Sequence, residues 1–145
     1  MKQGRLVVVW LGLTACMGVS EPSTAKTCIQ TYSAAQGWGV EEDPVWWGRD
    51  PEAVERDCDL FGDPCDADDF LTRAAAQCIA EGQALAPGLQ DWSYDLGYEE
   101  SLSTVRWRIE TVTEIGDTSS KGDFLSIDAQ TGEVVDAGSW TDEAI

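Results

Sequence analysis

The sequence predicts an α+β fold in which one main helix packs on a three- to four-stranded antiparallel sheet, after an irregular, disulfide-tied N-terminal segment. Three observations indicate this architecture. Residues 67–84 place apolar side chains at helical spacing, residues 92–135 largely alternate apolar and polar side chains, and four cysteines lie between positions 28 and 78.

Residues 1–15 have the pattern of a secretory signal peptide. Two positive charges within residues 1–5 precede an apolar run over 6–15, which is shorter than the about 20 residues that a membrane-spanning helix needs. The run ends in Leu-Thr-Ala-Cys at Cys16, which resembles the lipobox of bacterial lipoproteins. The resemblance implies cleavage before Cys16 and attachment of diacylglycerol to its thiol. The alternative is an ordinary signal peptide that ends near a cysteine.

A lipid on Cys16 ties the exported chain to a membrane of the cell envelope. Met17 follows the cysteine, and the absence of an Asp at this position favours the outer over the inner membrane. Residues 16–27 are small and mostly polar, so we expect them to form the lipidated N-terminus and a flexible spacer.

The mature chain is short and strongly acidic. Removal of residues 1–15 leaves 130 of the 145 residues, enough for one domain, and changes the formal charge from −18 to −20 because two basic residues are lost. A chain this acidic repels nucleic acid, so we expect no nucleic-acid partner. The acidic residues are interleaved with aromatic ones, which is typical of a folded domain rather than a disordered tail.

Cys28, Cys58, Cys65 and Cys78 remain after lipidation, and an even number in an exported chain indicates two disulfides. A zinc site is disfavoured because the chain has no histidine and no Cys-x-x-Cys pair. A helix starting at Asp66 would put Cys65 about 20 Å from Cys78, whereas a disulfide joins Cα atoms about 5.5 Å apart. Of the possible pairings we therefore favour Cys58–Cys65 with Cys28–Cys78.

The segment 28–65 is rich in Trp and Asp and is expected to be mostly irregular. One short helix fits within it, from Pro51 to about Asp59, with Asp50 as N-cap. The tryptophans of this segment either cover the open face of a thin sheet, which we favour, or form a binding surface. They are Trp38, Trp46 and Trp47.

Residues 66–145 carry the main α+β pattern. Asp66 is the expected N-cap of a helix over about 67–84, which Pro87-Gly88 ends. Its apolar stripe comprises Phe70, Leu71, Ala74, Ala75, Cys78 and Ile79. Strands are expected over 92–98, 105–112, 123–128 and 133–135, with turns or loops at 99–103, 116–122 and 129–132. One sheet face would pack on the helix, and Arg106 and Arg108 would lie beside carboxylates on the other.

This order of elements, closed by the stretch Phe-Leu-Ser-Ile-Asp-Ala-Gln-Thr-Gly-Glu-Val-Val over 124–135, resembles the PepSY-like domain. The resemblance covers about residues 66–140, although Asp128 and Gly132 would serve any tight hairpin equally well. No catalytic residues belong to the family pattern. Some members occur in propeptides of secreted metallopeptidases, where they are thought to inhibit, so the resemblance implies a protein-binding or inhibitory role.

No pattern in the chain points to catalysis or to a cofactor. The lack of histidine removes the usual serine, cysteine and zinc chemistries, and no phosphate-binding loop or dinucleotide fingerprint is present. An acidic cluster over 57–69 offers oxygen ligands for Ca²⁺, but Phe61 occupies a ligand position of the calcium-loop pattern, which favours a helix cap and a solvated loop. Its members are Asp57, Asp59, Asp63, Asp66, Asp68 and Asp69.

The sequence therefore predicts a non-catalytic envelope lipoprotein that acts as a protein-interaction or inhibitory module, with an envelope or secreted protein as its partner. A small-ligand or Ca²⁺-binding lipoprotein and a structural envelope component are the alternatives.

Overall fold

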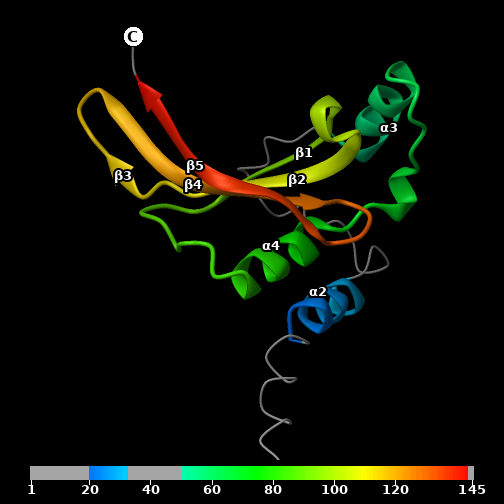
Figure 1. Ribbon diagram of the computed structural model, residues 1–145, viewed down its shortest axis with the longest axis horizontal. Helices are drawn as coiled ribbons and strands as arrows, with labels where there is room; N and C mark the ends of the chain where they lie inside the picture. Colours follow the sequence, from blue (N-terminus) through cyan, green and yellow to red (C-terminus); the bar gives the residue numbers. More distant parts are fainter. Residues whose placement is uncertain (1–19, 33–49, 144–145) are drawn as a thin grey trace, which may run out of the picture.

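The computed structural model describes residues 20–32 and 50–143, which form three α-helices and one five-stranded antiparallel sheet (Figure 1). The helices are α2 (Ser20–Thr31), α3 (Pro51–Leu60) and α4 (Arg73–Gly82). The strands are β1 (Ser93–Glu99), β2 (Thr104–Glu110), β3 (Glu114–Ile115), β4 (Ser119–Asp128) and β5 (Val134–Glu143). Two single-turn 3-10 helices, η2 (Ala67–Asp69) and η3 (Glu100–Leu102), lie between them. The predicted α+β class, with a helix on an antiparallel sheet, is confirmed.

The core lies between α4 and one face of the sheet. β2 lies between β1 and β4. The short β3 pairs with the first part of β4, on the same edge as β2, and β5 pairs with the opposite edge of β4. The register aligns Leu96, Trp107 and Ile127 in one row across three strands, and all three are fully buried. Figure 1 shows α4 below this sheet and α2 below α4, so these two helices form two layers on the apolar face, whereas α3 contacts β1.

The helix predicted over 67–84 is interrupted. The Asp66 side chain accepts a hydrogen bond from Asp68 N and caps only η2, whereas Thr72 caps α4 by accepting from Ala75 N. Between them Leu71 is bonded to the turn after β4 and to β2, because its N–H donates to Ala129 O at 2.6 Å and its carbonyl accepts from the Trp107 indole at 2.9 Å. These tertiary hydrogen bonds override the local helical pattern.

The sheet is longer than the sequence pattern predicts. The expected loop over 116–122 is shorter, because β4 begins at Ser119, and β5 runs to Glu143 rather than ending near residue 135. These added segments are polar and are joined by backbone pairing, from Ser119 opposite Glu143 to Gly122 opposite Trp140. Gly122 is required there, since a Cβ atom would overlap the Thr111 carbonyl oxygen.

Both favoured disulfides are present. Cys28–Cys78 and Cys58–Cys65 join Cα atoms 5.7 and 5.8 Å apart. The expectation of a flexible spacer does not hold for residues 20–27, because they belong to α2, which the first disulfide fixes on α4. The helix expected near 51–59 is confirmed as α3, and the Asp50 side chain accepts from Ala53 N at 2.8 Å.

Candidate functional site

The C-terminus of α3, the loop closed by Cys58–Cys65 and the turn between β1 and β2 meet at one end of the molecule. α3 ends at Leu60, and Phe61 then stacks on Tyr98 of β1, with ring centroids 5.0 Å apart and planes inclined by 18°. A groove of about 80 Å³ separates the loop from the turn and is lined by residues of both, among them Asp63 and Ser103. The disulfide therefore fixes this loop against the end of the sheet.

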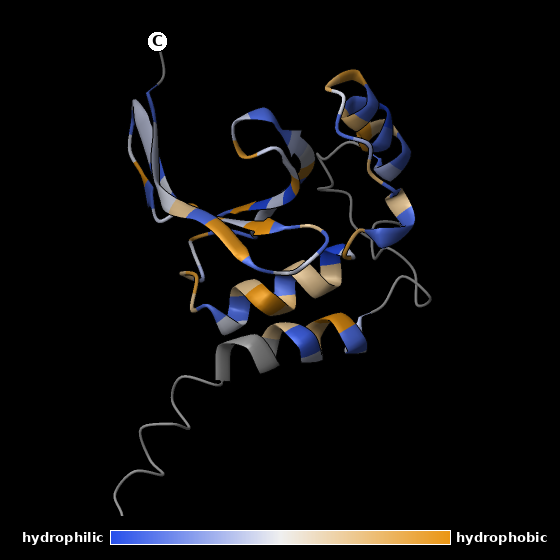
Figure 2. Cartoon of the chain, turned by 45° about the vertical axis from the view of Figure 1, so that its right-hand side comes forward, coloured by the Kyte–Doolittle hydropathy of each residue, from blue (hydrophilic) through white to orange (hydrophobic). Residues whose placement is uncertain are grey.

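This end exposes a group of apolar side chains. Leu60 is 82% exposed, Phe61 51% and Leu102, in the turn beyond Tyr98, 40%. Figure 2 shows hydrophobic colouring where α3 runs into the loop. We call Leu60, Phe61, Tyr98 and Leu102 the Phe61 surface. Single exposed apolar residues are common on proteins, but stacked aromatic rings next to further exposed apolar side chains are typical of a binding surface.

Carboxylates lie in the same elements as the Phe61 surface. Asp59 and Asp63 lie on its α3 side, and Glu100 lies on the turn. Within residues 50–143 no basic side chain forms an ion pair with any of these three. The Tyr98 hydroxyl donates to Asp63 Oδ2 at 3.1 Å. Desolvation, followed by this hydrogen bond and the negative charge of Asp63, raises the pKa of Tyr98 above its ordinary value of 10.0.

The acidic cluster over 57–69 does not converge on a cation. Within the described part of the chain, no three Asp, Glu or Cys side chains are grouped so that they could hold a metal ion. Asp66 is used as the cap of η2, and Asp63 accepts from Tyr98. The cluster thus consists of local caps and solvent-facing carboxylates spread around the loop.

The polar face of the sheet carries Arg106 and Arg108, as the alternation in β2 predicts. Arg106 forms ion pairs with Asp95 at 3.0 Å and, more distantly, with Glu99 at 3.7 Å. Arg108 pairs with Glu110 at 2.6 Å, and its guanidinium lies 4.0 Å from the centre of the Phe124 ring. Because these cations are already engaged within the sheet, they are poorly suited to bind an external anion.

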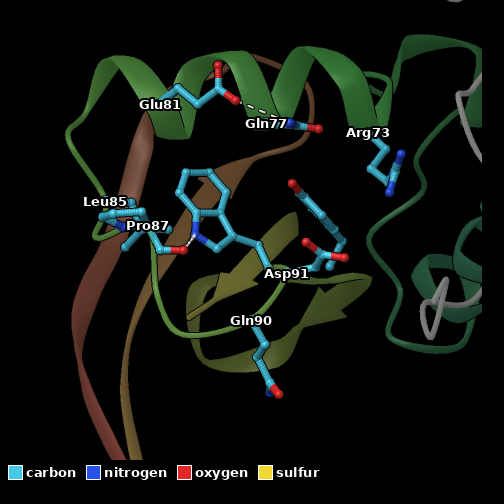
Figure 3. A pocket seen from close by; sticks show the side chains of 9 residues that line it. Arg73, Gln77, Glu81, Leu85, Pro87, Gln90 and Asp91 are labelled. Carbon is cyan, nitrogen blue, oxygen red and sulfur yellow. Dashed lines mark hydrogen bonds between the residues drawn. The ribbon is translucent and has the colours of Figure 1, made fainter. Parts of the chain in front are cut away.

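A pocket of about 510 Å³ opens between α4 and the start of β1 (Figure 3). Arg73, Gln77 and Glu81 line it from successive turns of α4, and Trp92 and Tyr94 line it from the strand side. The Trp92 indole donates to the carbonyl oxygens of Ala86 and Pro87, and Arg73 lies 5.0 Å from the centre of the Tyr94 ring. The pocket offers an aromatic wall with one cation, Arg73, and two carboxylates, Glu81 on α4 and Asp91 just before β1.

The folded chain brings together residues whose proximity was not predicted from the sequence. Cys16, Trp38, Trp46 and Trp47 lie outside the described residues, so their predicted roles stay predictions. The Phe61 surface was missed, although two adjacent apolar residues inside an acidic, cysteine-closed loop were a usable signal. The pocket was missed because Arg73 and Trp92 are 19 positions apart and meet only in the folded chain.

No protein-family model matches the chain, and neither the curated proteins nor the solved structures gave a match. The resemblance to PepSY-like domains therefore stays a prediction. Among residues 20–32 and 50–143, no helix is long and apolar enough to span a membrane.

Proposed function

We propose that this protein is a bacterial envelope lipoprotein, anchored through Cys16, whose domain binds another protein through the Phe61 surface and has no catalytic activity of its own. The observation that carries the proposal is this exposed apolar surface, with its stacked Phe61 and Tyr98 rings, beside a loop that a disulfide closes. The sequence pattern before Cys16 supports the anchor, and Met17 supports the outer membrane.

The partner is a protein segment that presents apolar and basic side chains together. The aromatic rings and leucines of the surface supply apolar contact area, and aromatic residues dominate many interfaces energetically. The carboxylates Asp59, Asp63 and Glu100 favour Lys and Arg, and a formal charge of −18 on the whole chain strengthens that preference. Inhibition of a secreted enzyme, which the PepSY-like resemblance implies, would be one use of such a contact.

Site-specific photo-crosslinking in living cells tests this function. A benzoylphenylalanine at position 61 keeps an aromatic ring stacked on Tyr98, and the same residue at Ile115, which is 60% exposed on β3, provides a matched control. We expect a discrete protein adduct from position 61 only, with the crosslink mapped by mass spectrometry to a basic, apolar segment. The adduct should weaken in the variant that combines Asp59→Asn with Glu100→Gln. Equal adducts from both positions, or none from position 61, would contradict the proposal.

The pocket beside Trp92 supports a second candidate, the binding of a small amphipathic ligand. Its volume of about 510 Å³ lies within the range of ligand sites, and Arg73 and Glu81 present opposite charges eight positions apart on α4. A ligand there would change the fluorescence of the Trp92 indole. Titration with a panel of zwitterionic and carboxylate compounds, compared with Trp92→Phe, tests this candidate, and no change that depends on Trp92 would remove it.

A further inference from the structure

The lipid anchor and the folded domain are joined by very little chain. Four peptide units separate Cys16 from Ser20, the first residue of α2, and they span at most about 14 Å. α2 is itself fixed, because Cys28 is buried and disulfide-bonded to Cys78 of α4. A lipid on Cys16 would thus hold one particular end of the domain near the bilayer.

The position of α2 identifies that end. α2 and α4 run in opposite directions, since Cys28 bonds to Cys78 while the Tyr32 carbonyl, past the end of α2, accepts from Thr72 at the start of α4. From Cys28 back to Ser20 the helix axis extends about 12 Å, whereas α4 continues only about 6 Å beyond Cys78. The start of α2 therefore lies near the end of α4 from which the following chain leaves, and Figure 1 shows α2 directly below α4.

The chain that follows α4 is uncharged and mainly apolar. Residues 83–90 read Gln-Ala-Leu-Ala-Pro-Gly-Leu-Gln, with no acidic or basic side chain, in a protein whose composition is 25% charged. We call this stretch the Leu89 loop. Leu89 is 64% exposed, and its backbone N–H donates to Val112 O at 2.7 Å, which ties the loop to the connection between β2 and β3. The loop thus presents an apolar side chain from a fixed backbone.

We propose that the Leu89 loop rests on the membrane surface, with Leu89 in the interfacial region of the lipid bilayer, and that the Phe61 surface faces away from it. This orientation relies on the lipid anchor of the proposed function. The Leu89 loop lies just before Trp92, whereas Tyr98 of the Phe61 surface lies near the end of β1. The extended chain between Trp92 and Tyr98 spans about 20 Å, which separates the loop from the surface. No carboxylate within residues 83–90 opposes anionic head groups, although Glu81 and Asp91 flank the loop, whereas Asp59 and Asp63 lie on either side of Phe61.

Photo-crosslinking to lipid tests the orientation on the full precursor, expressed in bacteria and processed in their own membranes. A photoreactive diazirine analogue of leucine is placed at position 89 or, as the matched control, at position 60, which is also an exposed leucine. Intact mass before irradiation reports whether the protein carries acyl chains, and mass after irradiation reports phospholipid adducts. We expect acylated protein with a several-fold higher adduct yield at position 89 than at position 60.

The outcomes separate the anchor from the orientation. Acylated protein with equal yields at the two positions, or with a higher yield at position 60, would overturn the orientation and leave the anchor in place. Protein without acyl mass would overturn the anchor itself and, with it, the orientation. Acylated protein that reacts with lipid chiefly at position 89 would support both.

Discussion

The two disulfides should differ in what they contribute to stability, because they close loops of different length. Cys28–Cys78 spans 50 positions and Cys58–Cys65 spans 7. In the chain-entropy description of cross-links, the longer loop corresponds to about 4 kcal/mol of stabilisation and the shorter one to about 2 kcal/mol. Replacing Cys28 and Cys78 together by Ala should therefore lower the free energy of unfolding by about twice as much as replacing Cys58 and Cys65.

Guanidinium unfolding followed by Trp fluorescence measures this difference. The two double variants are well matched, because Cys28 and Cys58 are both buried, so the packing lost at these positions is similar. The Cys28–Cys78 variant should also lose amide hydrogen-exchange protection in α2, since the bond fixes that helix to α4. Equal losses of stability, or a larger loss in the Cys58–Cys65 variant, would refute the reasoning from loop length.

Three further predictions follow from the core, the Tyr98 contact and the acidic cluster. Trp107→Ala should lower the free energy of unfolding by about 4 kcal/mol, because a fully buried ring is removed and the Leu71 carbonyl loses its hydrogen-bond donor. A loss below about 1 kcal/mol would contradict the packing described for Trp107. Asp63→Asn should lower the pKa of Tyr98 toward 10.0, measured by phenolate absorbance, because it removes a negative charge beside the hydroxyl. Because folding raises the pKa of Tyr98, the neutral phenol stabilises the folded state below about pH 10, and this contribution is lost as the pH rises through the folded-state pKa. The variant Tyr98→Phe should not show this loss of stability. Calorimetry with millimolar Ca²⁺ should detect no binding heat, because the carboxylates over 57–69 do not converge, and saturable heat would contradict the arrangement described for them.

Local patterns predicted the elements that depend on local chemistry. Asp50 before Pro51 is a sufficient signal for the start of α3, and alternation along β2 correctly placed Trp107 in the core and Arg108 on the polar face. The favoured disulfide pairing is present, but the argument against Cys65–Cys78 assumed a continuous helix from Asp66, and the structure interrupts that helix before α4.

Features that depend on distant contacts were not predictable from periodicity. Leu71 leaves the helical pattern because Ala129 and Trp107 bond to its backbone groups. β5 extends through polar residues because β4 pairs with it, and residues 20–27 are helical within α2, which Cys28 ties to α4. The pocket and the Phe61 surface belong to the same class, since each combines residues from separate elements that only the folded chain brings together.

Intact mass of the protein purified from bacterial membranes, with and without reduction before thiol alkylation, tests the central claim most directly. We predict a chain that begins at Cys16, heavier by diacylglyceryl and acyl groups, in which Cys28, Cys58, Cys65 and Cys78 are alkylated only after reduction. A chain without lipid would contradict the envelope anchor, and thiols that react before reduction would contradict the disulfides that hold α2 and the Phe61 surface in place.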